Sequence, residues 1–102
     1  MTGAMRVLAG LYRPVEAETP YGGRAVSHEA VGSTWLKCGA RRRQERGARD
    51  ERQAVETMTA EARADPRLEV GRLLRFGGAD WTIMTVEPAR LGRAKLGLER
   101  VR

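Results

Sequence analysis

Residues 72–86, RLLRFGGADWTIMTV, decide the fold, because two apolar stretches there flank a glycine-rich tetrapeptide. Trp81 to Val86 (WTIMTV) is the clearest strand in the chain, since β-branched and aromatic residues dominate it. Arg72 to Phe76 is short and extended in character. Gly77-Gly78-Ala79-Asp80 is typical of the tight connection in a β-hairpin. The stretch therefore predicts two antiparallel strands joined by a short turn.

Working outward from this hairpin, four more segments have the character of strands: Met5 to Pro14, Val26 to Cys38 with Gly32 as a candidate bulge, Ala54 to Arg63, and Lys95 to Val101. Residues 54–63 also fit helical spacing, but β-branched residues at Val55, Thr57 and Thr59 favour a strand. The turn signals between the segments are short and polar. The sequence predicts one all-β domain over residues 1–102, a small six-stranded barrel or sandwich.

Large side chains for a core are few, because aromatic residues make up only 5% of the chain. We expect the core to be built from aliphatic residues around a few larger ones. The candidate core residues are Trp35, Phe76, Trp81, Ile83 and Leu98. A thin core of this kind often gains stability from oligomerisation.

The stretch Arg41 to Gln53 (RRRQERGARDERQ) contains no large apolar residue. It predicts a long charged loop, about residues 40–53, between the second and third strands. Residues 37–52 hold seven basic and three acidic side chains, a local net charge of +4 in a chain whose total is +6. Such a concentration indicates a polyanion or a charged partner surface, although a loop that only keeps the protein soluble remains an alternative. The candidate residues are Arg41, Arg42, Arg43, Arg46, Arg49 and Arg52, with Gly47 as a hinge.

Motifs for other classes of function are missing from the sequence. There is no phosphate-binding glycine loop and no zinc-protease motif, and the single cysteine, Cys38, and single histidine, His28, cannot form a metal site alone. No apolar run approaches the length of a membrane span. We therefore expect neither an enzyme, nor a cofactor, nor a membrane partner. The basic residues do not lie on a recognition helix, so a sequence-specific DNA reader is disfavoured.

Several short motifs follow one another along nearly the whole chain. They are Leu11-Tyr12-Arg13-Pro14, Tyr21-Gly22-Gly23, Trp35, Arg43-Gln44-Glu45, Ala62-Arg63-Ala64-Asp65-Pro66-Arg67, Phe76 to Ile83, Val86-Glu87 and Leu96-Gly97-Leu98-Glu99. In this order they resemble the head–tail joining family, the small head-closure or stopper proteins of tailed phages and gene-transfer agents.

The resemblance implies a six-stranded barrel-like fold and a homo-oligomeric, dodecameric ring in a phage-like particle, assembled in the bacterial cytoplasm. It implies an adaptor or portal protein on the head side and a tail terminator on the tail side. It also implies that the charged loop points into the channel and helps to retain double-stranded DNA without reading its sequence. Two alternatives remain open: a tail-completion protein, and a stand-alone barrel that binds nucleic acid non-specifically.

Overall fold

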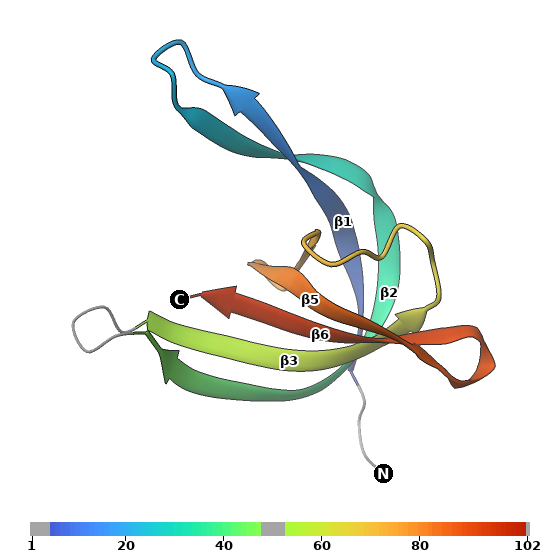
Figure 1. Cartoon of the computed structure of the whole chain (residues 1–102). Helices are drawn as coiled ribbons and strands as arrows, with labels where there is room; N and C mark the ends of the chain where they lie inside the picture. Colours follow the sequence, from blue (N-terminus) through green and yellow to red (C-terminus); the bar gives the residue numbers. More distant parts are fainter. Residues whose placement is uncertain (1–4, 48–52, 102) are drawn as a thin grey trace.

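The six strands close into a ring (Figure 1). The computed structural model describes residues 5–47 and 53–101. Their strands are β1 (Met5–Glu18), β2 (Arg24–Arg46), β3 (Gln53–Arg63), β4 (Leu73–Phe76), β5 (Ala79–Ala89) and β6 (Arg93–Val101). The strand order around the ring is β1-β2-β3-β6-β5-β4, and all neighbouring pairs are antiparallel. The prediction of a small all-β fold of six strands is confirmed. Within the described residues, no helix is long and apolar enough to cross a membrane.

Alternation of side chains decides which residues fill the interior of the ring. The ambiguous segment 54–63 is a strand, and its Met58, Ala60 and Ala62 face the core. The largest fully buried side chains are Trp81, Leu11, Leu36, Leu74, Ile83, Leu96, Leu98 and Val55. Phe76 is also buried and stacks on Trp81, with ring centroids 6.1 Å apart. Four of the five predicted core residues, Phe76, Trp81, Ile83 and Leu98, therefore lie in the interior.

Trp35 is the exception, and its predicted place in the core is wrong. Its side chain is 63% exposed, while its neighbour Leu36 is fully buried. Adjacent residues of a strand point to opposite faces, so only one of the two can enter the core. Trp35 instead lies on the outer face, directly across from the half-exposed Leu8 of β1.

The predicted loop at residues 40–53 is wrong for its first half, because β2 continues as a strand to Arg46. Residues 41–46 pair with residues 53–58 of β3. Backbone hydrogen bonds to β3 hold this part of β2 as a strand, although the side chains of residues 41–45 are exposed. The loop therefore begins at Gly47, and residues 48–52, which include the predicted Arg49 and Arg52, lie outside the described residues.

Three shifts of register bend the long strands so that the sheet can close. One lies in β2 beside Gly32, as predicted: Leu11 pairs with Gly32 and Tyr12 with Ala30, which leaves Val31 unopposed. A second lies in β2 between Cys38 and Arg41, and a third in β5 between Ile83 and Thr85. A Cβ atom at Gly32 would collide with the guanidinium group of Arg67.

Beyond the Gly32 bulge, β1 and β2 leave the ring as a two-stranded arm, residues 13–30 (Figure 1). β1 contacts β4 only through Gly10, Leu11 and Tyr12, so the arm has no third strand. The turn at its tip is closed by hydrogen bonds between Thr19 and the backbone of Gly22 and Gly23. The fold thus consists of a closed ring with one long projecting ribbon.

Candidate functional site

The charged end of the β2–β3 hairpin, residues 41–47 and 53–58, is the candidate site, and we call it the basic hairpin. Its arginines alternate between two faces of the ribbon. Arg41 and Arg43 lie opposite Met58 and Glu56, whose side chains are buried, so they continue the inner face of the ring. Arg42 lies opposite Thr57 on the outer face. The predicted residues therefore do not form one continuous basic surface.

Arg41 takes part in a cluster that covers the end of the core. The carboxylate of Glu56 accepts a hydrogen bond from Arg100 at 2.9 Å, and Arg41 lies 3.9 Å from its other oxygen. Both guanidinium groups also lie over the ring of Trp81, at 5.3 Å for Arg100 and 5.6 Å for Arg41. Stacking on an aromatic face and pairing with one carboxylate both restrain an arginine. Arg41 is therefore in part a structural residue.

The other predicted residues have different surroundings. Arg42 and Arg43 are exposed on strand β2, where their backbone is held by pairing with β3. Arg46 is the last residue of that strand. Gly47 has a φ of 122°, a conformation that side chains disfavour, at the point where the strand ends. This geometry is compatible with a hinge at Gly47.

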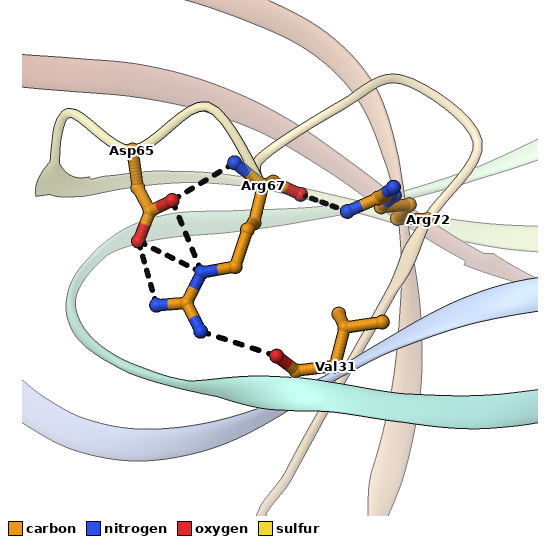
Figure 2. Close-up of polar contacts among 4 residues, drawn as sticks. All are labelled: Val31, Asp65, Arg67 and Arg72. Atoms are coloured by element: carbon orange, nitrogen blue, oxygen red, sulfur yellow. Dashed lines mark hydrogen bonds and ion pairs between the residues drawn. The ribbon is translucent and has the colours of Figure 1, made fainter.

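A second polar cluster joins the 64–72 connection to the Gly32 bulge (Figure 2). The guanidinium of Arg67 donates to the carbonyl oxygen of Val31 at 3.1 Å, and also donates to the Asp65 carboxylate at 2.8 Å. Arg72 donates to the carbonyl oxygen of Arg67 at 2.8 Å. Asp65 also accepts a hydrogen bond from the backbone N–H of Arg67. We call Asp65 and Arg67 the clamp, because they fix the base of the arm.

The clamp predicts a pH dependence of stability. Hydrogen bonds from Arg67 lower the pKa of Asp65 from 3.8 to about 2. A depressed carboxyl pKa stabilises the folded state above the unfolded pKa, and this contribution is lost as the pH falls through the folded value. We expect wild type to be more stable than Asp65→Asn above pH 3.8, with the difference shrinking as the pH falls toward about 2. Melting both proteins across this window tests it; a constant difference would contradict the assignment.

Sequence reasoning missed Glu56, Arg100 and the clamp as partners. Glu56 lies 44 residues from Arg100, and no local pattern links the two. The clamp did have a local signal. An aspartate whose side chain can accept the N–H two residues later, as Asp65 does from Arg67, is a common turn element. Among the described residues, no group of His, Cys, Asp and Glu side chains could hold a metal ion.

Comparison with solved structures reveals a likeness of the backbone. No family model matches the chain, and no curated protein matches it. The fold is similar to a chain in the solved structure described as "Virion of native gene transfer agent (GTA) particle". The TM-score is 0.73, the sequence identity is 23%, and the match covers 94% of each chain. At this identity the likeness establishes that the two chains share a fold.

Proposed function

We propose that this protein is a structural subunit of a tailed-phage or gene-transfer-agent particle, and that it acts there as the stopper between head and tail. The observation that carries the proposal is the shared fold with a chain of a gene transfer agent virion, which extends over 94% of both chains. Independently, the ordered motifs of the sequence resemble the head–tail joining family of tailed phages and gene-transfer agents. The role requires surfaces and no catalysis.

In this proposal, copies of the chain assemble in the bacterial cytoplasm into a dodecameric ring at the head–tail interface. The adaptor or portal protein lies on the head side and the tail terminator on the tail side. The basic hairpin faces the channel. Packaged double-stranded DNA passes through the ring when the particle delivers it.

Electrostatics suit a conduit for DNA of any sequence. A ring repeats the exposed Arg42 and Arg43 in every subunit, which concentrates positive potential in a narrow channel. Contacts from arginine to phosphate position DNA but do not read its bases. A hinge at Gly47 would let the tip of the hairpin move while the paired strands stay folded.

Shortening the tip of the basic hairpin tests whether the bulk of the hairpin closes the channel. Arg46 and Gln53 are directly paired, so residues 47–52 can be replaced by Asn-Gly, which closes hairpins of this kind. We expect a folded protein whose particles still join tails but leak DNA. The measurement is nuclease-protected DNA per particle, compared with wild type. Normal retention of DNA, or loss of tail joining, would indicate that the hairpin docks on a neighbouring protein instead of closing the channel.

Charge can be tested separately from bulk. Arg42→Gln with Arg43→Gln leaves Arg41 in its cluster with Glu56 and keeps the length of the tip. We expect milder leakage than with the shortened tip, and a smaller difference from wild type at high salt, because phosphate contacts weaken as salt rises. Lys95→Gln removes an exposed positive charge from β6, outside the basic hairpin and the arm, so it is the matched control and should retain DNA normally. Leakage that does not change with salt would contradict an electrostatic role for these arginines.

A further inference from the structure

The arm, residues 13–30, is a ribbon that contributes nothing to the core. Every residue from 24 to 30 is exposed, and β1 from Arg13 onward pairs only with β2. A two-stranded hairpin alone is marginally stable in water. Cross-strand ion pairs, Arg13 with Glu29 at 3.2 Å and Arg24 with Glu16 at 3.1 Å, support it only weakly because they are exposed. A ribbon of this kind suits a contact with another molecule.

The chemistry of the arm differs from that of the rest of the chain. It holds three glutamates and two arginines, a net charge of −1, whereas the chain as a whole is +6. The rest of the chain, outside the arm, therefore carries the basic excess. The arm also presents apolar groups to solvent: Tyr21 at its tip is 97% exposed, and Val26 is 57% exposed. The surface that complements an acidic ribbon with an aromatic tip is basic and partly apolar.

The outer face of the ring around Trp35 has those properties. Trp35 lies opposite Leu8, and both are more than half exposed. A hollow beside them is lined by Arg6, Thr34, Trp35, Arg63, Asp65 and Arg93. Two residues along the same strands, Arg6 of β1 lies directly opposite Lys37 of β2. We call this region the Trp35 face; an exposed tryptophan flanked by arginines is typical of a protein interface.

The geometry separates the arm from the Trp35 face of its own chain. The same two strands form both, so the arm continues away from the ring (Figure 1). Its direction is set at the Gly32 bulge, where the clamp holds the carbonyl of Val31 (Figure 2). The arm has six cross-strand pairs, from Arg13–Glu29 to Glu18–Arg24, and at about 3.4 Å per residue they give a reach of about 20 Å. That is comparable to the shortest dimension of the molecule, 24 Å, so the arm can cross onto a neighbouring copy.

We propose that the arm of one copy docks on the Trp35 face of a second copy, in a head-to-tail contact. The charges are complementary, and the exposed Tyr21 and Trp35 provide apolar area on each side. Two different surfaces meet in such a contact, so repetition closes a ring when the rotation allows it. The inference deepens the proposed function, since it supplies the contact between subunits of the proposed ring.

Complementary variants of the isolated chain test the contact. The arm variant carries Glu18→Lys and Tyr21→Ala; the face variant carries Trp35→Ala and Arg63→Glu. All four side chains are exposed, so both variants should melt as wild type does. Because the apolar area is small, we expect wild type to self-associate with a Kd of about 0.1–1 mM in sedimentation velocity. Each variant alone should associate at least about tenfold more weakly.

The decisive sample is an equimolar mixture of the two variants. Each retains one intact surface, so the mixture should form a heterodimer with wild-type affinity and nothing larger. Val70→Ala is the control: Val70 is 63% exposed but lies on neither the arm nor the Trp35 face, so this variant should associate like wild type. Monomeric wild type at about 1 mM, or a mixture without heterodimers, overturns the inference. Neither outcome affects the DNA-retention test, so the two proposals can fail separately.

Discussion

Trp81→Ala is expected to lower the free energy of unfolding by about 3–5 kcal/mol, the range for large aromatic-to-alanine changes in cores. The Trp81 side chain is only 1% exposed. It stacks on Phe76, and two guanidinium groups lie over its ring. The rest of the core consists mostly of aliphatic side chains smaller than an indole, so truncation to alanine leaves a cavity. The cavity therefore adds to the lost burial.

The chain offers a matched control in its other tryptophan. Trp35 is 63% exposed on β2, so Trp35→Ala should change stability by no more than about 0.5 kcal/mol. Denaturant unfolding of both variants, followed by circular dichroism, measures the difference directly. Equal effects from the two substitutions would contradict the inward and outward assignment of the tryptophans.

Local signals were sufficient where they agreed with one another. In residues 72–86 the glycine turn, the β-branched residues and the alternation all indicate a hairpin, and the structure has β4 and β5 there. At Trp35-Leu36 the local signal was insufficient, because two adjacent apolar residues are compatible with either face. The register with β1, which pairs Trp35 with Leu8, fixes the answer, and register depends on the whole sheet.

The strand at residues 41–46 shows a second limit of sequence reasoning. Hydrophobic alternation identifies strands that have one buried face. Here the side chains are charged, and the partner strand β3 supplies the pairing. The basic character of the candidate site could thus be predicted from composition, but its strand pairing could not. The arm was also missed, because the sequence predicts only residues 26–38 of β2 to be extended. The bulge at Gly32, at the base of the arm, is the one feature of the arm that the sequence predicts correctly.

Glu56→Ala is expected to lower the free energy of unfolding by about 1.5–3 kcal/mol, the range for hydrogen bonds to charged groups. The Glu56 side chain is only 9% exposed, and Arg100, its closer partner at 2.9 Å, is 26% exposed. Loss of the carboxylate leaves two positive groups over one indole ring, where they repel each other. Water can reach both guanidiniums, which keeps the cost below that of an isolated buried charge.

The two arginines should differ in a way that tests this account of the cluster. Arg41 is 57% exposed and 3.9 Å from Glu56, so Arg41→Ala should cost less than about 1 kcal/mol, whereas Arg100→Ala should approach the cost of Glu56→Ala. Glu56→Gln keeps the packing but removes the charge, and should lie between wild type and Glu56→Ala. Denaturant unfolding of the four variants gives the ranking. If Arg41→Ala lowers stability the most, Arg41 is a structural residue of the closed sheet and does not share the role proposed for Arg42 and Arg43. If it is nearly neutral, Arg41 is only weakly tied to Glu56 and can share the role proposed for Arg42 and Arg43.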